Sequence, residues 1–215
     1  MSEEKTPYVG RAMERVEDAV LLSATARFAD DMPTAQGTLH AAILRSPHAS
    51  AEILSIDTSA AERQAGIAAV LTGADVKAAT SPFLIVVKQP MDQWSLATDR
   101  VRFVGEAVAM VIAEDRYLAE DAVDLIQVEY KNLKPVIVPL DAAKDDAPLV
   151  HIAVGTNVVS SRDFTYGDPD RAFAEADYTV ALSISYPRNS QTPLEGYVVV
   201  AEYDLNGGVY DVMSN

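Results

Sequence analysis

The chain has 215 residues, of which 49% are hydrophobic, which is enough to bury one sizeable core or two small ones. Its net charge is −15 and its basic residues form no run, so we expect it to bind neither nucleic acid nor an anionic membrane surface. It has no cysteine, which excludes a disulfide framework, a zinc–thiolate site, an iron–sulfur cluster held by this chain and a cysteine nucleophile.

No stretch approaches the roughly 20 apolar residues that a membrane-spanning helix needs. The beginning of the chain also lacks the apolar region of a secretory signal. We therefore expect a soluble, cytoplasmic protein.

Residues 1–25 show no clear hydrophobic period, and their alternating charges predict an extended arm or a short solvated helix. Apolar runs then predict strands near 39–43 and 53–56, separated by the turn-like residues 46–48. Ser59 and Glu62 have the spacing of a capping box, which predicts a short helix starting there. The elements expected next are the end of this helix at Gly66, a strand at 67–71, and a second short helix after the turn 72–75.

The clearest block runs from residue 101 to residue 130. Its apolar residues first alternate or run together, then recur at helical spacing, and finally return to a strand pattern. The expected elements are strands at 101–104 and 107–113 separated by Gly105-Glu106, a helix capped by Glu114-Asp115, and a strand at 127–130.

Prolines and charged residues between 131 and 148 predict a linker, and we divide the chain there into segments 1–145 and 146–215. Asp168-Pro169-Asp170 has the pattern of a helix start. The second segment thus predicts one helix and an incomplete sheet, with strands expected at 158–166, 178–186, 197–203 and 209–213 and a tight turn at 205–208.

Chemistry-bearing residues are few. His40, His48 and His151 lack metal-ligand spacing, and no catalytic residue or metal ligand is predicted. Glu195 is the one carboxylate that we single out, because it precedes an apolar strand and has Arg188 nearby in the sequence. A structural role, paired with Arg188 or with a backbone group, is favoured over a catalytic role because a buried unpaired charge is costly.

Several short phrases occur in a recognisable order along nearly the whole chain. They are Arg45-Ser-Pro-His-Ala49, Ile53-Leu-Ser-Ile-Asp57, Val70-Leu-Thr-Gly-Ala-Asp75, Val101-Arg-Phe-Val-Gly-Glu-Ala-Val-Ala109, Ala119-Glu-Asp-Ala122, Val128-Glu-Tyr130, Ala172-Phe-Ala-Glu-Ala176, Pro193-Leu-Glu195 and Ala201-Glu-Tyr-Asp204. In this order the chain resembles the start of the molybdopterin-binding large subunit of molybdenum hydroxylases, the xanthine dehydrogenase/aldehyde oxidase family.

The resemblance implies an α+β fold, with an α/β hammerhead domain at 1–145 followed by the truncated start of a mixed α/β molybdopterin-binding domain at 146–215. It places Glu195 in a residue pattern that supports the cofactor domain. One phrase departs from the family, since Leu21-Leu-Ser-Ala-Thr-Ala26 stands where Leu-Leu-x-Gly-x-Gly is usual, which suggests an altered turn or inter-subunit contact. The family's residues around the metal are expected beyond Asn215.

By the same resemblance, the assembled enzyme would be an oxidoreductase that hydroxylates an aldehyde, an N-heterocycle or a similar small molecule with oxygen from water. Electrons would pass from the molybdenum cofactor through [2Fe-2S] clusters to FAD on partner chains. This chain, inactive alone, would supply scaffold and pocket walls to a second large-subunit fragment carrying the molybdopterin site. The alternatives are a non-catalytic hammerhead interaction module that has lost the cofactor part, and an independent small-molecule binding protein, against which the incomplete sheet argues.

Overall fold

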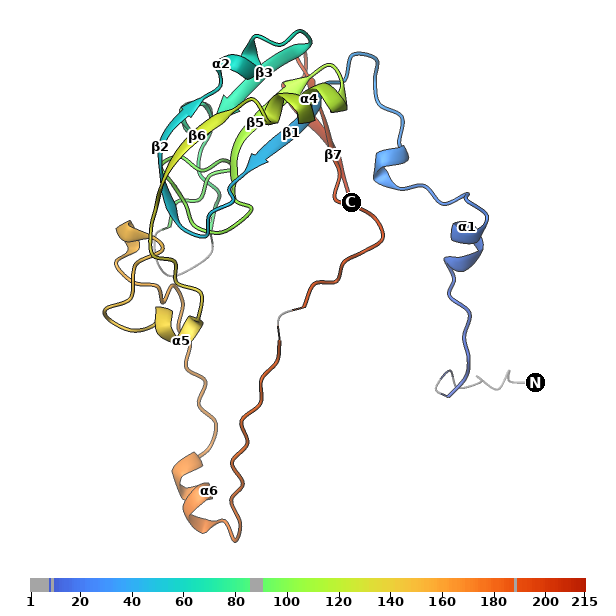
Figure 1. The fold of residues 1–215 in the computed structure, drawn as a ribbon. Coiled ribbons are helices and arrows are strands. Elements are labelled where there is room, and N and C mark those ends of the chain that lie inside the picture. Colours follow the sequence, from blue (N-terminus) through green and yellow to red (C-terminus); the bar gives the residue numbers. More distant parts are fainter. Residues whose placement is uncertain (1–7, 9, 86–90, 188) are drawn as a thin grey trace, which may run out of the picture. The chain divides into compact units, whose positions relative to one another are not determined.

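The computed structural model describes residues 8, 10–85, 91–187 and 189–215, and its secondary structure is mixed helix and strand. The chain divides into two compact units (Figure 1). The central unit comprises residues 37–180, and the terminal unit comprises residues 1–36 together with 181–215. Among the described residues, no helix is long and apolar enough to cross a membrane.

The central unit contains two three-stranded antiparallel sheets, with strand orders β1-β5-β3 and β4-β2-β6. Its elements are β1 (His40–Arg45), β2 (Ala51–Asp57), α2 (Ser59–Glu62), β3 (Ile67–Thr72), α3 (Gly73–Ala79), β4 (Arg100–Val101), β5 (Ala107–Ala113), α4 (Arg116–Val123), β6 (Gln127–Asn132), α5 (Pro139–Ala142), the 3-10 turn η2 (Ile152–Val154) and α6 (Pro169–Glu175).

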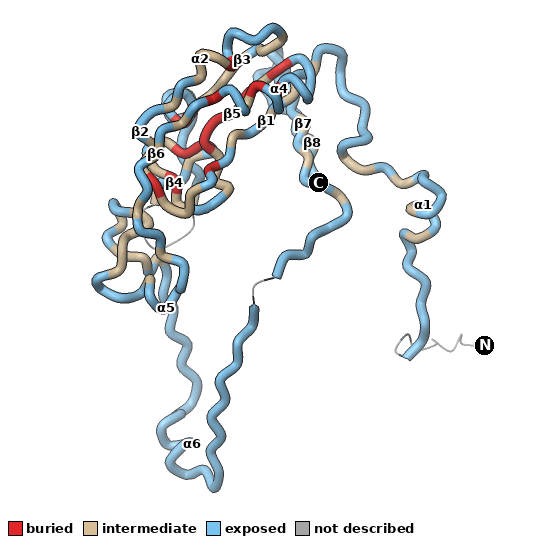
Figure 2. Tube along the Cα trace, in the orientation of Figure 1, coloured by how far each residue is buried: buried red, intermediate tan, exposed pale blue. Residues whose placement is uncertain are grey.

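Strand β5 is the centre of the core, as its uninterrupted apolar sequence predicts. Figure 2 shows the buried residues concentrated along this strand and in the elements around it. One cluster of small side chains lets α4 lie close to the sheet, and it consists of Ala61, Ala109, Val111, Ala113, Ala119, Ala122 and Ile126. A second cluster joins β5 to the other sheet through Ala51, Ala97, Val101 and Val108. Burial of these side chains is the main source of stability of the unit.

Helix caps in the central unit follow from short polar side chains. Asp115 caps α4 by accepting hydrogen bonds from the amides of Tyr117 and Leu118, at 2.8 and 3.4 Å, as predicted. Asp75 accepts hydrogen bonds from the amide and the hydroxyl of Thr72 at the start of α3, and the hydroxyl bond holds the pKa of Asp75 below its ordinary value.

Three sequence predictions in this unit are wrong. Helix α2 begins at Ser59 instead of being capped by it: Thr58 is the N-cap, and its hydroxyl donates to Glu62 at 2.6 Å. Residues 102–104 are not a strand, because the chain leaves β4 after Val101 and enters a turn. The helix, strand 107–113 and strand 127–130 of the central block are confirmed, but β5 and β6 lie in different sheets.

The segment expected to be a linker is partly folded. It contains α5, and Asn157 fastens it by donating to the carbonyls of Ala142 and Pro148 and accepting from the amide of Val150. The stretch 158–166 is not assigned as a strand, whereas α6 begins as predicted after Asp168, whose side chain accepts from the amide of Arg171.

The terminal unit contains α1 (Asp18–Leu22), the 3-10 turn η1 (Ala29–Asp31) and the antiparallel hairpin of β7 (Val199–Asp204) and β8 (Val209–Ser214). The predicted turn at 205–208 is confirmed: the amide of Gly208, at φ +64°, donates to the carbonyl of Asp204. The strand expected at 178–186 has no assigned ladder, and its Tyr, Val, Leu and Ile side chains are exposed.

Ala24 ends α1 in the left-handed region, at φ +54°. The amides of Thr25 and Ala26 both donate to the carbonyl of Val20, at 3.0 and 3.1 Å, which closes the helix end. Ala24 is the first of the two positions where the family phrase has glycine, so the backbone adopts there a conformation that glycine favours.

Candidate functional site

A cleft of about 890 Å³ is the largest hollow of the central unit among its described residues. It opens between the start of α3, the loop 91–99, the turn 102–106 and the stretch 150–154. Trp94, Leu96 and Phe103 give it apolar walls. The charged and polar lining residues are Lys77, Asp92, Asp99, Arg100, Arg102, Glu106 and His151. A concave surface of this size that mixes apolar walls with a few polar groups is typical of a small-molecule or peptide-binding surface.

The turn 102–106 is built onto the end of β1. The amide of Gly105, at φ +91°, donates to the carbonyl of Ser46 at 2.8 Å, and the amide of Ser46 donates to the carbonyl of Glu106 at 2.9 Å. The Arg45 guanidinium donates to the carbonyl of Gly105 at 2.9 Å. Because the turn needs a positive φ at Gly105, the sequence Gly-Glu fixes where the Glu106 side chain enters the cleft.

Arg102 organises the charged side of the cleft. Its guanidinium lies 3.7 Å from a carboxylate oxygen of Glu106 and 3.6 Å from one of Asp99, and it donates to the carbonyl of Arg100 at 3.0 Å. The Arg102 amide also donates to the Glu106 carboxylate. The side chains of Arg102 and Glu106 are only 22% and 16% exposed, so this pair is partly desolvated, unlike a surface ion pair.

Burial shapes the titration of two groups in the cleft. It raises the pKa of Glu106 above its ordinary value of 4.5, against the opposing effect of the hydrogen bond from the Arg102 amide and the charge of Arg102. Burial also lowers the pKa of His151 below 6.5, and the positive charge of Arg102 acts in the same direction. The neutral imidazole of His151 is therefore favoured at neutral pH.

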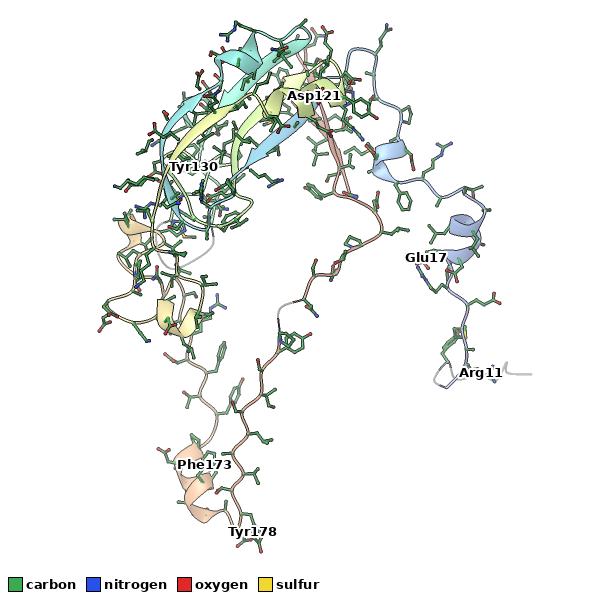
Figure 3. All side chains as sticks on the ribbon, viewed as in Figure 1. Arg11, Glu17, Asp121, Tyr130, Phe173 and Tyr178 are labelled. Carbon is green, nitrogen blue, oxygen red and sulfur yellow. The ribbon has the colours of Figure 1, made fainter. Side chains whose placement is uncertain are left out.

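The three histidines lie apart. His40 is on β1, and His48 contacts the ring of Tyr130 edge-on, with 4.7 Å between the ring centroids (Figure 3 labels Tyr130). Only His151 lines the cleft. Among the described residues, no group of three or more His, Asp or Glu side chains is arranged to hold a metal ion.

Glu195, the residue singled out from the sequence, belongs to the terminal unit and not to the cleft. Its carboxylate accepts a hydrogen bond from the backbone amide of Ala29 at 2.7 Å, between two segments far apart in the sequence. This contact ties η1 to the stretch before β7. Arg188, its expected ion-pair partner, lies outside the described residues, so that pairing stays a prediction.

Molybdopterin would need a cradle of buried polar groups around its pterin and phosphate. In the described part of residues 150–215 no residue is buried, and the exposed side chains there include Phe173 and Tyr178, which project from α6 and from the chain after it (Figure 3). These residues by themselves do not fit the cofactor. What the arrangement can do is bind and shape: the described cleft holds no nucleophile beside a base.

The sequence gave no warning of the Arg102–Glu106–His151 cluster. Arg102 and Glu106 stand four residues apart around Gly105, a spacing that could have suggested an ion pair across a turn. His151 is distant in the sequence and follows a proline-rich stretch, so no local pattern could have linked it to them.

Comparison with known proteins covers almost the whole chain. The family model described as "Aldehyde oxidase and xanthine dehydrogenase, a/b hammerhead domain" matches residues 23–134, and that of the molybdopterin cofactor-binding domain matches residues 150–215. The large subunit of nicotine 6-hydroxylase from Paenarthrobacter nicotinovorans is 34% identical over 200 residues, which are 91% of this chain and 24% of that one.

Two further relatives differ in how much of them the chain spans. The crystal structure of quinoline 2-oxidoreductase from Pseudomonas putida 86 matches with a TM-score of 0.79 and 35% identity, over 95% of this chain and 26% of that one. The large molybdopterin subunit of nicotinate dehydrogenase from Eubacterium barkeri is 31% identical over 96% of this chain and 47% of its own length.

The chain therefore spans about a quarter of the length of the nicotine and quinoline relatives. The hammerhead model alone matches more than half of the chain, in the same α+β arrangement of β1 to β6 described above. The resemblance noted from the short phrases is confirmed, and the chain belongs to the aldehyde oxidase and xanthine dehydrogenase family of molybdenum hydroxylases.

Proposed function

We propose that this chain is the hammerhead part and the first molybdopterin-domain segment of a molybdenum-dependent hydroxylase large subunit, with the division between the two near residue 145. In the assembled enzyme it supplies scaffold and pocket walls, while residues outside this chain hold the cofactor. The observation that carries the proposal is the ordered match of both family models, at 23–134 and 150–215, to one chain.

The exposed surface of residues 150–215 supports this role. An isolated soluble domain rarely exposes many large apolar side chains together. Here they recur at every second position of an extended stretch, at Tyr178, Val180, Leu182, Ile184 and Tyr186. A strand with one apolar edge-to-face pattern and no ladder partner is completed by pairing with a sheet. We propose that the remainder of the large subunit provides that sheet.

The reaction we propose is oxidative hydroxylation of an aldehyde, N-heterocycle or similar small molecule, with electrons passed to [2Fe-2S] and FAD on partner subunits. The names of relatives that act on nicotine, quinoline and nicotinate support the N-heterocycle class. The absence of cysteine agrees with clusters carried by another chain. The shorter nicotinate relative supports a large subunit that is divided between polypeptides. A cytoplasmic location is part of the same proposal, and fractionation of host cells tests it.

Glu195 is proposed to support the cofactor domain by fixing η1 against the chain before β7. Its bond to the Ala29 amide at 2.7 Å supports a positioning role over a catalytic one.

The second candidate is a non-catalytic hammerhead interaction module that has lost the cofactor part, which the lack of a cofactor cradle in the described residues favours. A neighbouring reading frame encoding the rest of the molybdopterin domain supports the enzyme, and its absence supports the module. Hydrogen exchange separates them biochemically: we expect the amides of residues 178–186 to exchange quickly in the isolated chain and slowly in its native assembly. Equally fast exchange in both would contradict the proposal.

A further inference from the structure

A second, much smaller cavity adjoins the charged side of the cleft. It has a volume of about 20 Å³ and is lined by Arg102 and by Ala49, Ser50, Lys134, Val136, Pro148, Leu149 and Val150. Roughly 10–15 Å³, measured in this way, holds one water molecule. The cavity lies within the central unit, between the turn that carries Arg102 and the partly folded stretch 134–150.

Arg102 has one donor without a protein acceptor among the described residues. Its terminal nitrogens are engaged by Asp99, Glu106 and the carbonyl of Arg100, whereas Nε is buried and makes no hydrogen bond to them. A buried donor left unsatisfied costs roughly 1–3 kcal/mol, so such groups nearly always have a partner. Because Nε is inaccessible to solvent, the open cleft cannot supply that partner.

We propose that the small cavity is a binding site for a single ordered water molecule, which accepts a hydrogen bond from Arg102 Nε and donates to backbone carbonyls of the cavity wall. Two wall carbonyls are placed by the fold: that of Ser50 accepts from the Leu133 amide at 2.9 Å, and that of Pro148 accepts from Asn157 at 3.0 Å. A carbonyl oxygen has two lone pairs, so each can accept a second hydrogen bond.

Charge favours water over a small anion at this site. Asp99 and Glu106 offset the positive charge of the Arg102 guanidinium, and Lys134, the other cation of the wall, is exposed and keeps its ammonium hydrated. A neutral ligand with both donors and acceptors therefore fits better than a halide. The water would join the 134–150 stretch to the turn 102–106, and so hold Arg102 in place on the cleft wall.

A crystal structure of the full chain, with whatever chains purify with it, tests the site at a resolution that shows ordered water. We expect one density peak about 2.7–3.2 Å from Arg102 Nε, unchanged after a bromide soak. An empty cavity, a protein carbonyl within hydrogen-bond distance of Nε, or an anomalous bromide signal at the peak would each overturn the proposal.

Matched variants identify which atom holds the water. Arg102→Lys keeps a cation near Glu106 and Asp99 but removes the Nε donor, and we expect the peak to disappear. Arg100→Lys is the control, because Arg100 pairs with Glu52 at 3.8 Å and lines only the larger cleft. It should retain the peak. A peak that survives in Arg102→Lys would refute the role of Nε; if that variant does not fold, the wild-type density alone decides.

Discussion

Replacing Ala24 by glycine should stabilise the end of α1. The Ala24 backbone lies at φ +54°, a region that costs a residue with a Cβ roughly 1–2 kcal/mol. Glycine avoids this cost but loses about 0.5–1 kcal/mol more conformational entropy on folding. The Ala24 methyl group is exposed, so no packing is lost. The net gain in the free energy of unfolding should be about 0.5–1 kcal/mol.

Hydrogen exchange of the Thr25 and Ala26 amides reports this gain locally, because both donate to the carbonyl of Val20 only while the helix end is closed. A gain of about 0.5–1 kcal/mol slows their exchange roughly two- to five-fold. If the terminal unit unfolds together with the rest, the midpoint of thermal unfolding rises by about 1–4 °C.

Ala26→Gly is the matched control, two residues further along the same phrase. Ala26 is half-buried and is not among the described residues with positive φ, so glycine there only adds flexibility and removes contact. It should speed exchange at these amides. The reasoning is refuted if Ala24→Gly destabilises the helix end, or if both variants change it in the same direction.

Three other substitutions probe the central unit. Gly73→Ala should destabilise by about 1–3 kcal/mol in chemical denaturation, because its Cβ would lie 2.0 Å from the carbonyl oxygen of Ala97, whereas Gly196→Ala, with open space around it, should change little. Asp115→Ala should cost about 1 kcal/mol through loss of the α4 cap, while Asp121→Ala on the exposed face of the same helix (Figure 3) should stay within about 0.5 kcal/mol. Since burial raises the pKa of Glu106, its contribution to stability is complete below pH 4.5 and is lost as pH rises through the higher folded-state pKa; the stability of wild type relative to Glu106→Gln should fall with pH in that range, and a flat or rising difference across a pH series of urea melts would contradict the assignment.

The hammerhead core was predictable because its signals are local. The apolar run 107–113 could only be a buried strand, and Asp115 has the side chain and position of a helix cap. The capping box at Ser59 was placed one residue late, since Thr58 can donate to Glu62 equally well and the sequence does not decide between them. Strand partners were harder, because nothing local shows that β5 and β6 belong to different sheets.

The stretches at 158–166 and 178–186 have the alternation of strands, yet no ladder forms among the described residues. A strand pattern records a preference for a pleated, half-buried surface, and the ladder needs a partner that the pattern does not contain. The cleft was unpredictable for a related reason. Its charged side joins Arg102 and Glu106 to His151, which reaches them only because Asn157 folds the intervening stretch back.

The central claim is that this chain works as part of a molybdenum hydroxylase. The most direct test is to purify the protein that carries it from its own host, identify the accompanying chains by mass spectrometry and measure molybdenum by elemental analysis. We predict stoichiometric molybdenum together with an iron–sulfur chain, a flavin chain and the rest of the large subunit. A folded, metal-free chain with none of these partners would contradict the account and leave the interaction module.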